Sequence, residues 1–458
     1  MKRPACRLPR TAAARTRVVV LAAAVILACL PPVATAQTPS PSAHRTGPAH
    51  GEALALWASA SRRADSHRVD ALIEEAMAHS PLIDGARQHW QAQTKAPVQA
   101  GALPDPQIIF QHFSVGDPGP GSGLGNSDFA YLGFGASQDV PFPGKLGLQA
   151  AIAEKDAESA RQQYEAARRD IAEKVRELYF ELSYHVQIDA LFHQIRDELG
   201  RIAQIAETRY RVGEAQQQDV IKAQLQMTAI LKELAMHHQD LDQVQLELKA
   251  VLGRDASAPD VEPGELAPST IRLNAAELRK LVDAHSPELR MQHTLEERDR
   301  AGLELARKGY QPDFSVGYVF EHTGNRFRDY YMLTLGAKIP LYFWRKQTPA
   351  IEQAELELQA ARAQIRARTL DMTATVDRQV IAFQTAERVL TIYREGLIPQ
   401  AQDSLDAALA AYRVSKVDFQ TLLSAVIDLL NVNQEYYREV ADHEIALAKI
   451  EQVVGDLK

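Results

Sequence analysis

The sequence predicts a mainly α-helical chain with membrane β-strands, built from one structural unit that occurs twice. Two observations support this prediction: four short motifs recur in the same order about 200 residues apart, and residues 146–210 contain no proline. The motifs are Ala-His-Ser-Pro (78–81 and 284–287), Pro-Asp (104–105 and 312–313), Gly-Ala (135–136 and 336–337) and Tyr-Arg-Val (210–212 and 412–414). Each copy should therefore have the same plan: short helix, strand pair, very long helix, sharp turn and return helix.

The first 36 residues are expected to be a signal peptide that precedes the fold. A basic stretch comes first, residues 18–30 are apolar, and Ala-Thr-Ala at 34–36 fits the rule for signal cleavage. An alternative is lipidation at Cys29, because the residues before it resemble a lipobox, although two prolines follow. Residues 37–66 are rich in Pro, Ser, Ala and His and are expected to have little order.

Composition excludes several classes of function. Both cysteines, Cys6 and Cys29, lie in the leader, so the mature chain should have no disulfide and no cysteine metal site or nucleophile. The formal charge is -8, and removing the basic leader makes it more negative, which argues against nucleic acid as a partner. After the leader, no apolar stretch approaches the roughly 20 residues that a membrane helix needs.

The first copy, residues 67–270, should begin with short helices and a strand pair. A helix that starts near Pro81 must end before the prolines at 104 and 106. Strands are expected near 107–114 and 128–140, on either side of a glycine-rich loop. The segment that ends the second strand and opens the next helix contains Pro141, Pro143, Gly144 and Lys145.

Two long helices follow, over 146–211 and 217–252. Apolar residues recur at a spacing of three and four, and about 65 residues of helix reach roughly 100 Å, too long for one globular domain. Gly213 suits a left-handed helix end and marks the reversal of the chain. The return helix has a heptad-like apolar seam, which predicts coiled-coil packing.

The second copy, residues 271–458, repeats this plan. Strands are expected near 313–321 and 329–340, and long helices over 346–412 and 418–455. Apolar bulk alternates with small or polar residues along the strands, as in a barrel wall between lipid and water, and aromatic residues at the strand ends could form interfacial belts. These aromatic residues are Phe110, Phe129, Tyr131, Tyr330, Phe343 and Trp344.

The alternative is a soluble hairpin whose apolar face covers a helix. Four strands cannot close a barrel with a lumen, and open strand edges are not tolerated in lipid. Strands placed in a membrane would therefore require several chains to share one barrel.

The order of elements and the local motifs resemble the TolC-like outer membrane efflux proteins. Residues 138–146, Gln-Asp-Val-Pro-Phe-Pro-Gly-Lys-Leu, resemble the signature where strand meets long helix, and most closely that of the heavy-metal branch. The resemblance implies a homotrimer with a twelve-stranded barrel in the outer membrane and an α-helical coiled-coil tunnel across the periplasm. It also implies a periplasmic membrane-fusion adaptor and a proton-driven inner-membrane pump of the RND type as partners. Such a protein is a passive conduit rather than an enzyme, and it needs no cofactor.

The resemblance also points to the periplasmic tip as the gate. The best-known members of that family narrow the tunnel with aspartates that follow the second tip turn. At the corresponding positions this chain has Thr421 and Ser424. An acidic mouth that favours cations is one interpretation, and helix capping by the same acids is the other. The tip candidates in this chain are Gly213, Glu214, Asp219, Ser415 and Asp418.

No metal-binding or catalytic site is expected. His237 and His238 are adjacent and point about 100° apart on a helix, and His185 and His193 are eight residues apart, so neither pair should hold one ion. No nucleotide-binding loop, Ser-His-Asp order or metalloprotease histidine pair is present. The functional hypotheses are an exit duct for heavy-metal cations, a duct for organic toxins, drugs or secreted substrates, and a periplasmic coiled-coil adaptor or scaffold.

Overall fold

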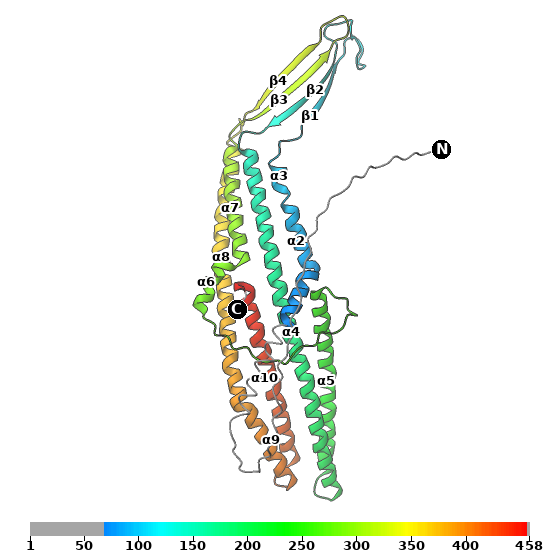
Figure 1. The fold of residues 1–458 in the computed structure, drawn as a ribbon, viewed down its shortest axis with the longest axis vertical. Coiled ribbons are helices and arrows are strands. Elements are labelled where there is room, and N and C mark those ends of the chain that lie inside the picture. Colours follow the sequence, from blue (N-terminus) through cyan, green and yellow to red (C-terminus); the bar gives the residue numbers. More distant parts are fainter. Residues whose placement is uncertain (1–67, 456–458) are drawn as a thin grey trace, which may run out of the picture. The chain divides into compact units, whose positions relative to one another are not determined.

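The computed structural model describes residues 68–455. The proposed signal peptide, Cys29 and the whole low-order segment 37–66 lie outside the described residues. Within them, a four-stranded sheet occupies one end of a bundle of long helices, and the two helical turns at the other end lie together (Figure 1). Among the described helices, none has a stretch both long and apolar enough to cross a membrane.

Each copy contributes two strands and a set of helices. The first copy has a helix over 68–79, then α2 (Pro81–Gln93), α3 (Ala96–Ala100), β1 (Gln107–Phe113), β2 (Tyr131–Val140), α4 (Lys145–Arg211) and α5 (Gln217–Leu252). The second has α6 (Ala275–His285), α7 (Pro287–Lys308), β3 (Asp313–His322), β4 (Tyr330–Lys338), α8 (Gln347–Ile392), η1 (Tyr393–Leu397), α9 (Ile398–Arg413) and α10 (Phe419–Val454).

The sheet has the order β1-β2-β3-β4 and is antiparallel throughout, so the two copies join where β2 pairs with β3. The register aligns Phe110, Phe134, Phe320 and Tyr331 in one row across all four strands. Most of the bulky side chains on this face are exposed, with Ile108 of β1 90% exposed. The opposite face carries mainly small or polar residues, including paired Ser137 and Gly317 and Gly317 paired with Thr334.

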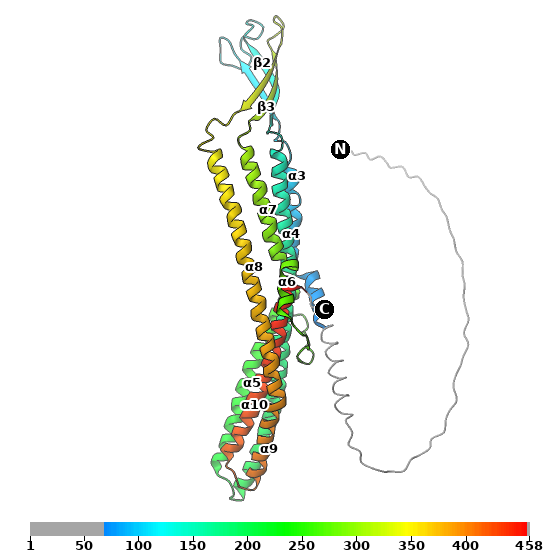
Figure 2. The same ribbon diagram turned by 90° about the vertical axis from the view of Figure 1, so that its left-hand side faces the viewer.

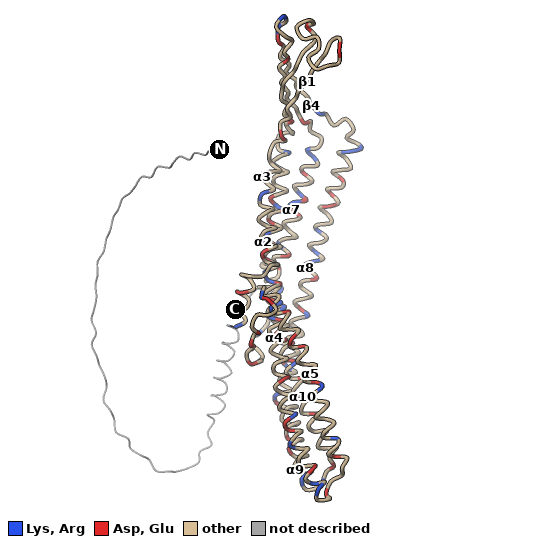
Figure 3. The backbone as a smooth tube through the Cα atoms, turned by 90° about the vertical axis from the view of Figure 1, so that its right-hand side faces the viewer, with Lys and Arg blue, Asp and Glu red and all other residues tan. Residues whose placement is uncertain are grey.

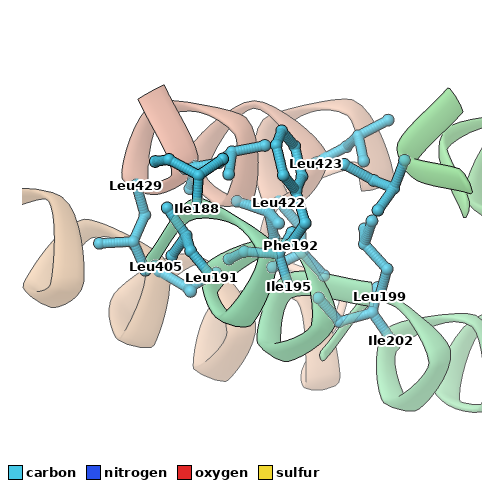
Figure 4. Close-up of a cluster of buried hydrophobic side chains, with 14 of the residues drawn as sticks. Ile188, Leu191, Phe192, Ile195, Leu199, Ile202, Leu405, Leu422, Leu423 and Leu429 are labelled. Carbon is cyan, nitrogen blue, oxygen red and sulfur yellow. The ribbon is translucent and has the colours of Figure 1, made fainter. Parts of the chain in front are cut away.

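The apolar stripe of α4 lies in the core, as its spacing predicts. Ile171, Val175, Leu178 and Leu182 are all buried in a cluster with α5 and the helix over 68–79. Nearer the tip, a second cluster joins α4, α5, α9 and α10, and Figure 4 shows Phe192 among leucines and isoleucines from α4, α9 and α10. Charged residues of both signs are spread along the helices (Figure 3), where many of them pair with a neighbour three or four residues away.

The long helix expected over 346–412 contains a π-helical turn that its sequence pattern did not predict. This turn, Tyr393–Leu397, lies between α8 and α9, and Figure 2 shows α8 running toward α9 at the tip. Pro399 is the physical reason, because proline has no N–H to donate to the carbonyl of Glu395 four residues earlier. The strand expected from 128 begins at Tyr131, and the strand expected to 340 ends at Lys338.

Candidate functional site

The two helical turns at the tip have the same backbone form but different residues. In the turn between α4 and α5, Gly213 has φ 80° and donates its N–H to the carbonyl of Tyr210 at 3.0 Å. In the turn between α9 and α10, Ser415 has φ 57° and donates to Tyr412 at 3.1 Å. Ser415 thus occupies the left-handed position that glycine takes in the first copy, at a steric cost that glycine avoids.

Arg209 joins the two turns. Its guanidinium donates to the backbone carbonyl of Tyr412 and to the hydroxyl of Ser415, and it lies 4.7 Å above the Tyr412 ring. It also approaches its own turn, with Nη2 3.4 Å from the Glu214 carbonyl and Nε 3.8 Å from the Glu214 carboxylate. The hydroxyl of Ser415 therefore has a role that a glycine could not fill.

The phenol of Tyr412 completes this contact. The side chain is only 2% exposed, and burial raises the pKa of Tyr412, as does the negative charge of Asp219 nearby.

A second contact joins the N-terminal parts of the return helices α5 and α10, where Lys222 Nζ donates to Gln420 Oε1 at 3.0 Å. We call Arg209, Tyr412 and Ser415 the tip lock.

The acidic tip residues differ in position. Asp418 caps α10 and accepts hydrogen bonds from the backbone N–H of Thr421 at 2.8 Å and from its hydroxyl at 2.6 Å. These bonds hold the pKa of Asp418 below its ordinary value. Asp219 lies in the first turn of α5, where the cap residue Gln216 makes no side-chain cap bond. The capping interpretation thus has direct support at Asp418.

Arg209 is the tip residue that sequence reasoning missed, although the sequence contained a signal. The buried positions Ile195, Leu199, Ile202 and Ala206 follow a spacing of four and three, and the next position of that seam is Arg209. Arg209 is itself only 8% exposed. A charged residue at a core position of a helix needs a buried partner, and that partner comes from the other copy.

The strand-to-helix signature forms a joint between the two copies at the other end of the helices. Gly144 has φ 88° and precedes the first residue of α4, Lys145. The Lys145 ammonium lies 2.7 Å from the Asp313 carboxylate, which also accepts the backbone N–H of Phe142 at 2.8 Å. Because Lys145 is mostly buried, this pair fixes the start of α4 against the start of β3.

The two prolines of the signature flank Phe142 in the sequence. The ring of Phe142 makes a further contact to the second copy. Lys308, at the end of α7, lies 5.8 Å above the Phe142 ring and 3.5 Å from the carbonyl of Pro143. Pro141 follows the last residue of β2 and has no N–H for a sheet ladder. The signature therefore has a structural role where the sheet meets the helices.

Within residues 68–455, two groups of side chains could hold a metal ion, and both lie away from the tip turns and from this joint. His185, His237 and Asp240 form one group between α4 and α5, and Asp189, His193 and His238 form another. Each group takes one histidine from α4 and one from α5, so neither the pair His237 and His238 nor the pair His185 and His193 lies in a single group. The return of α5 along α4 brings these side chains from the two helices together.

Comparisons with known proteins agree with this architecture. The chain matches the family model of the outer membrane efflux protein over residues 72–254 and 278–456. None of the curated proteins compared with the chain matches it at a significant level.

Solved structures show the same fold. The outer membrane protein VceC from Vibrio cholerae is 18% identical with a TM-score of 0.73, and the match covers 85% of this chain and 96% of that one. CusC is 14% identical with a TM-score of 0.73, covering 85% and 92%. The outer-membrane channel OprN is 12% identical with a TM-score of 0.74, covering 85% and 90%. The expected fold class is thereby confirmed.

Proposed function

Because the chain belongs to the outer membrane efflux protein family, we propose that it is the outer membrane duct of a tripartite efflux system and a passive exit for heavy-metal cations. The observation that carries this proposal is a four-stranded sheet with two open edges and an exposed apolar face, continuous with helices long enough to form a tunnel. The periplasmic adaptor and scaffold alternative does not account for the family match or for this fold.

A homotrimer follows from the open edges. Within the described chain, β1 and β4 each pair on one side only. An unpaired strand edge in lipid leaves backbone polar groups without hydrogen bonds, so the edges of neighbouring chains must pair. Three chains with four strands each give a barrel of about twelve strands, wide enough for a lumen.

The two faces of the sheet determine how the barrel lies in the membrane. The row of Phe110, Phe134, Phe320 and Tyr331 belongs on the lipid side, and the glycine, serine and threonine face belongs on the lumen side. The longer loops between paired strands, 114–130 and 323–329, then lie outside the cell, and the helices extend into the periplasm.

The tip lock is the proposed gate of the duct. Arg209 connects the α4–α5 turn to the α9–α10 turn within one chain, so these contacts must break if the turns separate. An adaptor or an inner-membrane pump of the RND type would dock at this end. Glu214, Asp219 and Asp418 lie in or beside the turns, and an acidic mouth favours cations over anions.

Heavy-metal cations are the proposed cargo because the signature at 138–146 resembles the heavy-metal branch of the family and because the tip is acidic. The proposed duct carries out no bond chemistry, and the pump selects and drives the cargo.

The test is growth of a strain that lacks its own duct but produces the matching adaptor and pump. With this chain, growth should recover in zinc, cobalt, cadmium or copper salts and should not recover in organic toxins. Recovery in organic toxins alone would overturn the metal proposal and leave the duct in place. A soluble monomer, obtained without detergent, would overturn the duct itself.

A further inference from the structure

We propose that the facing surfaces of α4 and α5 hold two neighbouring sites for a divalent transition metal, each made of two histidines and one aspartate. The first, site A, consists of His185, His237 and Asp240, and the second, site B, consists of Asp189, His193 and His238. In each group one potential ligand atom per residue lies within 4.8 Å of the others. Neither site includes a residue of the tip lock.

The spacing on α4 creates the arrangement. His185, Asp189 and His193 are successive fourth residues of one helix, so they lie on the same face. On α5, His237 and His238 point in directions about 100° apart, which would prevent them from sharing an ion but lets each serve a different site. His237 faces His185, with ring centroids 5.8 Å apart, and His238 faces Asp189.

Site A contains buried nitrogen atoms that have no partner. Among the described residues, neither His185 Nδ1 nor His237 Nδ1 has a hydrogen-bond partner. A buried polar atom without a partner is costly, and an ion bound at such a nitrogen would remove that cost.

One side of site A is formed by the buried ring of Phe192. The His237 ring packs 5.0 Å from Phe192, and Phe192 is 2% exposed in the apolar cluster of Figure 4. This contact holds the imidazole in place from the side of the protein core. Ligands fixed in advance lose little freedom when a metal binds.

Site B is already partly assembled. His238 Nε2 lies 2.7 Å from Asp189 Oδ1, and His193 Nε2 lies 3.6 Å from Asp189 Oδ2. The carboxylate thus bridges two imidazoles from two different helices. The donors of a four-coordinate zinc ion are about 3.4 Å apart, so closure needs side-chain movements on the order of 1 Å.

The ligand set indicates the class of ion. Two imidazoles with one carboxylate suit zinc, cobalt, nickel or copper, leave a position open for water, and are poorly matched to magnesium or calcium. Each site takes ligands from both helices, so an ion there would tie α4 to α5. Site B lies roughly 30 Å along α4 from the tip turn, given a rise of 1.5 Å per residue.

The test is zinc and cobalt binding by the full-length protein, purified in detergent without adaptor or pump. Titration with Zn²⁺ should reach about two ions per chain, and Co²⁺ should give visible absorption typical of low-coordinate nitrogen and oxygen ligands. The double variant His193→Gln/His238→Gln should lose about half of the bound metal. The variant His185→Gln/His237→Gln should lose the other half, and all four changes together should abolish specific binding and the rise in Tm that zinc causes.

The matched control is His89→Gln/His293→Gln, which removes two exposed helical histidines outside both groups. It should bind as the parent does. Equal loss in the control and in the site variants would show adventitious surface binding and overturn the proposal, as would unchanged stoichiometry in the fourfold variant. Because site B uses partly exposed side chains, its variant should keep the parent's helix content and assembly size. The measurement needs no cargo transport, so its failure would leave the proposed duct untouched.

Discussion

Replacing Arg209 with methionine should open the tip. Methionine keeps an unbranched apolar stem and the helix propensity at this position of the apolar seam, but it removes the donors to the Tyr412 carbonyl and the Ser415 hydroxyl. In this variant the Tyr412 carbonyl would still accept a hydrogen bond from the N–H of Ser415, so the carbonyl would not be left without a hydrogen bond. The variant therefore tests the contact between the turns rather than the folding of either turn.

The size of the effect follows from the geometry. Hydrogen bonds from a charged donor contribute about 1.5–3 kcal/mol each, and a guanidinium over a phenol ring adds about 1 kcal/mol. The methionine side chain offsets part of the lost free energy by burying apolar surface on the seam. A net loss of about 2–4 kcal/mol would shift the balance between joined and separated turns roughly 30- to 700-fold.

The assay is single-channel recording of the purified trimer in planar bilayers. Arg209→Met should lengthen the time spent in the high-conductance state, and Ser415→Ala should show a smaller part of the same change. The matched control is Arg211→Met, because Arg211 lies two residues further along, is exposed and pairs with Glu207 of its own helix. A time spent in the high-conductance state that equals the parent's, or an equal effect in the control, would refute the tip lock as a gate.

Three further outcomes are expected. Glu75→Gln should lower the Tm near neutral pH, because Arg254 donates two hydrogen bonds to this carboxylate and holds the pKa of Glu75 below its ordinary value. This stabilisation is present above the unfolded pKa and is lost as pH falls through the folded one, so the parent and variant melting temperatures should converge in acid. Asp219→Asn with Asp418→Asn should reduce the preference for cations in reversal-potential measurements, and an unchanged preference would leave capping as the role of Asp418. A cysteine at Ser122, in the loop 114–130, should react with an impermeant thiol reagent on whole cells. Labelling only after lysis would place this loop on the periplasmic side and contradict the proposed orientation.

The sequence was sufficient for the elements whose pattern is local. The stripe through Ile171 and Leu182 identified α4, and strand alternation identified the two faces of the sheet, because helix and strand periodicities depend only on neighbours in the chain. The π turn before Pro399 is harder to predict, since the apolar pattern continues through it. Ser415 occupies the position of Gly213 in the second copy, and both residues have a positive φ.

The contacts between distant segments could not be derived in this way. Arg209 meets Ser415 across about 200 residues of chain, and His237 meets His185 only because α5 returns along α4 in one register. A shift of one residue in that register would rotate each histidine by about 100° and separate the ligand groups. Sequence periodicity identifies the faces that pack but does not specify which side chains meet.

Duplication with later divergence is what makes the tip lock chemically possible. At the position where the first copy has Arg209, the second has Ala411, and where the second has Ser415, the first has Gly213. Two identical turns would have offered the same groups on both sides of the contact. A chain with two unequal halves can instead supply a donor from one turn and an acceptor from the other, so the contact between them has a direction.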